Sequence, residues 1–165
     1  MNNPDEWSAW IEQHGASMLL LARQSLPRQA DAEDVVQEAF LRFWRSRDRA
    51  QDPAAYLFTC VRHCALDFNR GRVRRHDRER AAARPEQALD YFSAAPQERE
   101  RAARIEHALR QLPPPQREIL VLKLWSRLSF AQIAAALEIS PNTAASRYRY
   151  ALEKLRVHLP EEQVT

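Results

Sequence analysis

Glycine occupies only two of the 165 positions, and this scarcity limits the possible folds more than any other feature of the sequence. Ala, Leu, Arg, Glu and Gln dominate instead, and these residues lose least when they enter a helix. A hydrophobic fraction of 45% beside a charged fraction of 28% is typical of a globular chain rather than a disordered one. The sequence therefore predicts an all-α fold.

The first half of the chain contains three helical patterns. The first has apolar residues at mixed three- and four-residue spacing and ends before Pro27. The second begins with an acidic turn at Asp31, where carboxylates interact favourably with the helix dipole. Its predicted inward stripe consists of Val36, Phe40, Phe43 and Trp44. Residues 48–53 are expected to form a loop, and a third helix should start near Pro53.

The second half contains four helical patterns. The triple proline at 113–115 stops the first of them, and residues 116–124 form the second. Ser129 and Ser140 are predicted N-caps, the latter with Pro141 in the first position of a helix that runs to about His158. A short capped helix, a turn and a longer helix have the proportions of a helix-turn-helix, although a plain helical hairpin would show the same inward pattern.

Between the two halves the apolar pattern breaks down. Residues 81–97 have no continuous apolar face and contain Pro85 and Pro96. The sequence therefore predicts two small helical domains, 1–80 and 98–165, joined by a flexible linker at 81–97. The helix-turn-helix falls in the C-terminal domain.

Positive charge is concentrated rather than spread along the chain. The net charge is only +3, yet seven arginines crowd one stretch of the first half, and arginine suits bidentate contact with phosphate. The seven are Arg62, Arg70, Arg72, Arg74, Arg75, Arg78 and Arg80. A solvated helix face would have the same composition, so charge alone leaves both interpretations open.

Several classes of protein are excluded by what the sequence lacks. Cys60 and Cys64 fall on an apolar helix side without the further ligands that a metal site needs, so they are expected in the core. No glycine-rich phosphate loop or plausible catalytic set is present, and we expect neither an enzyme nor a cofactor. No apolar run could span a bilayer, and the N-terminus does not resemble a signal peptide, so a cytoplasmic protein is expected.

Four stretches resemble a known family. Residues 31–44 read DAEDVVQEAFLRFW, and Tyr56-Leu57-Phe58 is followed by Arg62 and Asp67. Further on, residues 117–122 read REILVL, and LSFAQIA at 128–134 precedes ISPNT at 139–143. In order and spacing these motifs resemble the extracytoplasmic-function (ECF) sigma factors of the sigma-70 family, which direct RNA polymerase to promoters.

The resemblance implies three binding surfaces and no catalytic residues. Core RNA polymerase, through its clamp coiled coil, would be bound by Asp34, Gln37, Glu38 and Leu41. The minus-ten promoter element would be bound and melted by Arg47, Tyr56, Phe58, Arg62, His63, Arg70, Arg72, Arg74 and Arg75. The minus-thirty-five element would be bound by Asn142, Thr143, Ser146, Arg147, Arg149 and Lys154. The polymerase flap and an anti-sigma factor are further expected partners.

The match is not complete. His63 stands where the family commonly has asparagine, and Glu138 occupies the usual position of a turn glycine. Ala145 replaces a basic residue, so Arg149, Asn142 or Ser146 is expected to read the minus-thirty-five element. Tyr56 and Phe58 could also be ordinary core aromatics.

Two other functions explain part of the sequence. A helix-turn-helix regulator that dimerises on an operator would account for the second half but not for the helix at Asp31. A helical protein-interaction module would account for the apolar stripes but not for the arginines.

Overall fold

A computed structural model of the chain describes residues 3–76 and 96–159, and within the helices it leaves out the side chains of residues 75, 76, 98, 99 and 102. All regular elements in these two ranges are helical, as the composition predicts. Most of the predicted linker, 81–97, lies outside the described residues.

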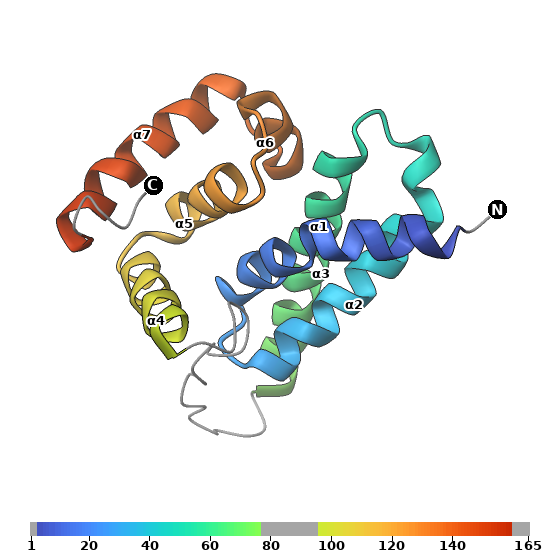
Figure 1. Cartoon of the computed structure of the whole chain (residues 1–165), viewed down its shortest axis with the longest axis horizontal. Coiled ribbons are helices and arrows are strands. Elements are labelled where there is room, and N and C mark those ends of the chain that lie inside the picture. The colour runs from blue at the N-terminus through green and yellow to red at the C-terminus, as the bar shows by residue number, and fades with distance from the viewer. Residues whose placement is uncertain (1–2, 77–95, 160–165) are drawn as a thin grey trace.

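The first half forms three helices around an aromatic core (Figure 1). They are α1 (Pro4–Arg23), α2 (Gln29–Ser46) and α3 (Pro53–His76), with a short 3₁₀ turn η1 (Arg47–Arg49) in the predicted loop. Trp7 meets Phe40 edge to face with ring centroids 4.5 Å apart, and Trp10 lies 4.8 Å from Phe43. Such pairs hold α1 against α2 through large apolar surfaces.

The predicted inward stripe of α2 is confirmed with one adjustment. Phe40, Phe43 and Trp44 are buried, whereas Val36 is only partly buried and its neighbour Val35 takes the deeper position. Cys60 and Cys64 are free and buried in the same core, which confirms their predicted placement.

The second half forms a separate group of short helices. They are α4 (Pro96–Arg110), α5 (Pro114–Leu120), a π-helical turn η2 (Val121–Trp125), α6 (Phe130–Leu137) and α7 (Pro141–His158). Both predicted N-caps are present: Ser129 and Gln132 form a reciprocal capping box, and the Ser140 side chain accepts a hydrogen bond from the Thr143 amide. Both α6 and α7 are therefore capped at their N-termini.

The two halves pack against each other. Helix α6 contacts α3 (Figure 1), and η2 contacts α1. One continuous apolar cluster runs through both halves. The Ser17 hydroxyl donates a hydrogen bond of 3.0 Å to the Trp125 carbonyl across this seam. The two halves of the chain are therefore in direct contact.

Candidate functional site

The outward face of α2 presents a single row of side chains. Asp34, Gln37, Glu38 and Leu41 are spaced as neighbours on one helix face, and all four are exposed. Leu41 keeps 42% of its surface accessible to solvent, although the opposite face of the same helix is buried. The exposed position expected for these four residues is confirmed.

A shallow groove extends this face onto α3. It has a volume of about 370 Å³, and Asp34, Glu38, Arg42, Asp67 and Phe68 contribute to its lining. The Arg42 guanidinium lies 2.9 Å from Glu38 Oε1 and 3.6 Å from Asp67 Oδ2, so it links the two helices across the groove. The row on α2 therefore belongs to a two-helix surface with an apolar floor and an acidic rim.

Two residues predicted to contact the minus-ten element have structural roles. Phe58 has no exposed surface and lies in the core, so the core interpretation holds for this residue and its ring cannot meet a base. The guanidinium of Arg47 stacks over the Trp44 ring at 3.6 Å and donates a hydrogen bond to the Trp44 carbonyl. The Arg47 side chain, only 12% exposed, anchors the η1 turn.

Tyr56 lies at the margin of the core. It is partly buried, its ring centroid is 6.2 Å from that of Phe43, and burial raises the pKa of its phenol. Tyr56 lies in the first turn of α3, which contacts η1.

Arg62 and His63 face the second half of the chain. The Arg62 guanidinium lies 3.7 Å from a carboxylate oxygen of Glu118, and His63 Nε2 lies 3.2 Å from Glu138 Oε1. Asp52, at the start of α3, accepts a hydrogen bond of 2.9 Å from the Gln132 side chain. The surface of α3 that bears Arg62 and His63 is therefore covered in part by residues of the second half.

The arginines further along α3 remain open to solvent. Arg70 and Arg74 are exposed, Arg72 is partly buried, and Arg70 lies 4.0 Å from Asp67. The side chain of Arg75 is outside the described residues. This end of α3 thus keeps a cationic surface.

The Glu118 carboxylate lies close to positively charged side chains from both halves of the chain. Burial raises the pKa of its carboxyl, and the positive charges of Arg62, Arg117 and Arg147 oppose that rise. The carboxylate is partly buried, and its pKa stays raised because desolvation outweighs the attraction of the three guanidinium groups.

Helix α7 presents two neighbouring rows. Asn142, Ser146 and Arg149 are exposed at spacings of four and three, and Ala144, Ala151 and Leu155 are buried on the opposite side. The second row holds Thr143, Arg147 and Lys154, of which only Lys154 is fully exposed. The Thr143 hydroxyl lies 2.8 Å from that of Ser140, so it takes part in the helix cap.

Glu138 stands in the turn before α7, where the backbone has a conformation that favours glycine. Its φ of 57° lies in the left-handed region, which favours glycine and costs other residues about 1–2 kcal/mol. The carboxylate contact with His63 accompanies this strained backbone.

Comparison with protein families covers both halves of the chain. The model described as Sigma-70 region 2 matches residues 10–79, and the model described as Sigma-70, region 4 matches residues 102–155. The ECF RNA polymerase sigma factor SigL of Mycobacterium tuberculosis is 33% identical over 163 residues, covering 95% of this chain and 90% of that protein. This chain is an ECF sigma factor.

Other relatives agree with that assignment. The RNA polymerase sigma-E factor of Streptomyces coelicolor is 29% identical over 93% of this chain and 86% of its own length. The solved structure of the sigma factor RpoE with the anti-sigma factor NepR, from Bartonella quintana, has the same fold, with a TM-score of 0.71 and 24% identity over 97% of this chain and 99% of that one. CnrH in complex with the cytosolic domain of CnrY has a TM-score of 0.64 and 26% identity over 94% and 88% of the two chains.

The family assignment settles the function at the level of the whole protein. As a sigma factor, the chain binds core RNA polymerase and promoter DNA and directs transcription initiation. Sigma factors are transcription factors rather than enzymes. The region 2 match includes α2, which the operator-binding alternative leaves unexplained.

The sequence missed the contacts that join the two regions of this sigma factor. Glu118 and Gln132 were not predicted as functional, and each meets a residue from the other half. Asp52 and Gln132 are 80 positions apart, and no periodic pattern in a single sequence links residues at that separation.

Within the described residues, no helix of this sigma factor is both long and apolar enough to cross a bilayer.

Proposed function

We propose that this sigma factor divides its work among three surfaces. The outward row of α2 (Asp34, Gln37, Glu38 and Leu41) binds the polymerase clamp coiled coil. The exposed side of α3 with Tyr56, Arg62 and His63 holds the minus-ten element, and α7 reads the minus-thirty-five element through Asn142, Ser146 and Arg149. The observation that carries the proposal is the position of the α2 row, which is exposed on a helix whose other face packs in the core and lies within the region 2 match.

Chemistry fits each assignment. Base capture in a single strand relies on aromatic stacking and cationic contacts to the backbone, which Tyr56 and Arg62 can supply. Arg70, Arg72 and Arg74 would neutralise duplex phosphates, so this part of the affinity should weaken as salt increases. Arg149 can make a bidentate contact with guanine, and Asn142 with adenine.

The contact between the two halves implies a change of arrangement. Arg62 and His63 are engaged by Glu118 and Glu138, so region 4 must move away before α3 can receive the minus-ten strand. Polymerase would stabilise the separated arrangement by holding each region at its own site.

Domain limits of 1–80 and 98–165 agree with the two family matches, which cover 10–79 and 102–155. The polymerase flap is a proposed second contact for region 4. An anti-sigma factor is a proposed partner because RpoE, which has the same fold, is solved with the anti-sigma factor NepR. A partner of polymerase would act in the cytoplasm.

The polymerase surface can be tested with one double variant. Gln37→Ala with Glu38→Ala removes two polar contacts from the row on α2 without touching the core, so the affinity for core polymerase should fall roughly tenfold or more. A pull-down of core polymerase with the tagged sigma factor measures this. Unchanged affinity would reject this face.

A matched control is available on α1. Glu12 and Gln13 are exposed and have the same two residue types in the reverse order. Glu12→Ala with Gln13→Ala should leave polymerase binding unchanged. An equal loss in both double variants would indicate a general charge effect rather than a specific face.

A further inference from the structure

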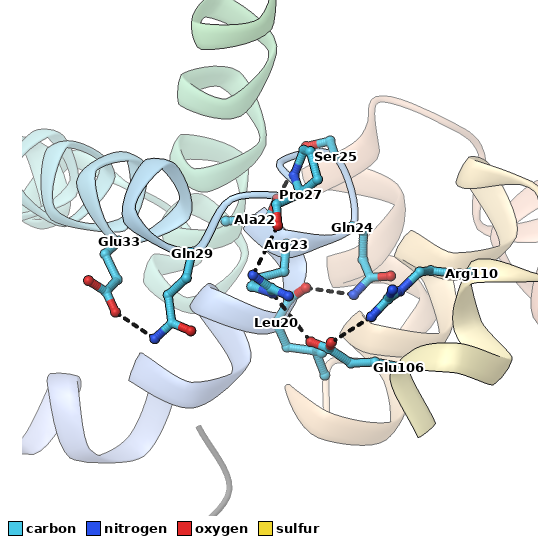
Figure 2. Close-up of polar contacts among 10 residues, drawn as sticks. All are labelled: Leu20, Ala22, Arg23, Gln24, Ser25, Pro27, Gln29, Glu33, Glu106 and Arg110. Atoms are coloured by element: carbon cyan, nitrogen blue, oxygen red, sulfur yellow. Dashed lines mark hydrogen bonds and ion pairs between the residues drawn. The ribbon is translucent and has the colours of Figure 1, made fainter. Parts of the chain in front are cut away.

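A polar pocket lies on the side of the domain seam formed by α1, α4 and α5. It has a volume of about 140 Å³, enough for several water molecules or one phosphate-sized group. Its walls come from the end of α1 and the following turn on one side and from α4 and α5 on the other (Figure 2). The lining residues are Arg23, Gln24, Ser25, Pro27, Glu106, Arg110 and Arg117.

One carboxylate in this pocket is shared between two arginines. Glu106 is only 5% exposed at its side chain, and its two oxygens lie 3.4 Å from Arg23 Nε and 3.2 Å from Arg110 Nη2. Arg23, which is 4% exposed, also donates a hydrogen bond to the Pro27 carbonyl (Figure 2). Region 2 and region 4 therefore meet here through a buried ion pair.

Arg117 adds a third guanidinium without adding a carboxylate. Its Nε is buried and has no hydrogen-bond partner within the described part of the chain. Burial lowers the pKa of Arg117, an effect that Arg110 strengthens and Glu118 opposes. Glu118 does not line the pocket, and its carboxylate, which is close enough to Arg117 to oppose the decrease, also lies 3.7 Å from the Arg62 guanidinium.

The charges in the pocket are therefore unbalanced. Among the described lining residues, three arginines lie around one carboxylate: Arg23 is buried, Arg117 is partly buried with a buried Nε, and Arg110 is 43% exposed. Partial burial of a guanidinium group without a full anionic partner is unfavourable. A second anion would correct the imbalance. Planar guanidinium groups bind tetrahedral oxyanions through paired N–H donors, and the Gln24 side chain lines the same space.

We propose that this pocket is a binding site for a small phosphate-bearing anion. Because its walls come from both regions, the anion would bind the closed arrangement and favour it over the separated one. The binding itself follows from the pocket. Its consequence, weaker association with polymerase, rests on the proposed need for the two regions to separate.

Binding can be measured by thermal unfolding in the presence of inorganic phosphate or pyrophosphate. At concentrations well above the dissociation constant, the midpoint Tm should rise by roughly 5 °C relative to sodium chloride of the same ionic strength. Arg117→Gln should abolish this rise. Arg104→Gln is the matched control, since Arg104 lies on the exposed side of α4 and is paired with Glu100. It should keep the full rise.

Two outcomes would overturn the site. One is the same rise in all three proteins, which would mean diffuse binding to surface arginines, and the other is no rise in the wild type. If Arg117→Gln does not fold, as judged by circular dichroism, Arg110→Gln takes its place, because Arg110 is 43% exposed and its loss leaves the Arg23–Glu106 pair intact.

A second measurement separates the site from its consequence. Pyrophosphate should lower the affinity of the wild type for core polymerase and leave that of Arg117→Gln unchanged. A Tm rise that Arg117→Gln abolishes, without any effect on polymerase affinity, would confirm the site and refute its regulatory role. A short DNA duplex without promoter sequence is tested in parallel. If the ligand is a free anion, the duplex should not produce the Arg117-dependent rise in Tm.

Discussion

Burial has the largest effect on the pKa of the Cys64 thiol. Burial raises the pKa of its thiol from 9.0 to about 11, and the charge of Arg42 opposes the rise. At neutral pH both Cys60 and Cys64 should therefore remain protonated and react slowly with alkylating reagents while the protein is folded.

This shift predicts a loss of stability at alkaline pH. The unfolded thiol ionises near pH 9 and the folded one near pH 11, so the unfolded state gains stability between these values. The free energy of unfolding should fall by up to about 2–3 kcal/mol across that window through Cys64. Urea titrations at several pH values should show a shallower fall for Cys64→Ala. An identical decrease of the free energy of unfolding with pH in the wild type and in Cys64→Ala would contradict the raised pKa of Cys64.

Arg47 illustrates the limit of residue-level prediction. In sequence it is one of many arginines near a promoter-binding stretch, but in the structure its guanidinium stacks on Trp44 and stabilises a turn. A flat cation next to an aromatic face gains from packing as well as charge. The sequence could not predict this structural role of Arg47, because the role depends on the geometry of the end of α2.

At the scale of single helices, amphipathic patterning fixes which side chains face outward. On α7 the buried residues Ala144, Ala151 and Leu155 orient the helix against α5 and leave Asn142, Ser146 and Arg149 on the exposed side. Because the guanidinium of Arg149 rests 5.2 Å from the Tyr150 ring, it is held near the helix surface and remains available to a partner.

This orientation predicts a specificity change at α7. Arg149→Ala should alter the preferred minus-thirty-five sequence and weaken binding to the preferred site by about 1–3 kcal/mol. Selection from a randomised promoter library measures both effects. Arg156→Ala, an exposed arginine in the last turn of the same helix, should weaken binding evenly or not at all. An identical consensus for wild type and Arg149→Ala would reject the reading role.

At the scale of the whole molecule, the two regions cover part of each other. Polar contacts at the seam join Asp52 to Gln132, Arg62 to Glu118 and His63 to Glu138. The last two place carboxylates next to residues that we propose hold the minus-ten strand. The free protein should therefore bind the minus-ten strand poorly.

Removing the two carboxylates should weaken the seam. In Glu118→Gln with Glu138→Gln the side-chain shapes are kept while the charges facing Arg62 and His63 are lost, so the separated arrangement becomes more populated. Binding of a single-stranded minus-ten oligonucleotide to the free protein should increase several-fold by fluorescence anisotropy. The control is Glu100→Gln with Glu153→Gln, which removes two exposed carboxylates away from these contacts. An equal increase in the control would attribute the effect to net charge alone.

The sequence alone determined the helices, their caps, the two halves and the outward row on α2. These features are set by contacts within a few residues, such as the Ser129 capping box, or by the 3.6-residue period of a helix. The motifs at 31–44 and 128–143 also identified the family.

Only the tertiary structure decided that Phe58 is buried, that Arg62 and His63 face region 4, and that two arginines share the Glu106 carboxylate at the seam. Each of these depends on side chains from distant parts of the chain meeting in space. The Arg23–Glu106 pair joins residues 83 positions apart by numbering, and whether such charges meet is set by the packing of α4 against the end of α1, which no local pattern encodes.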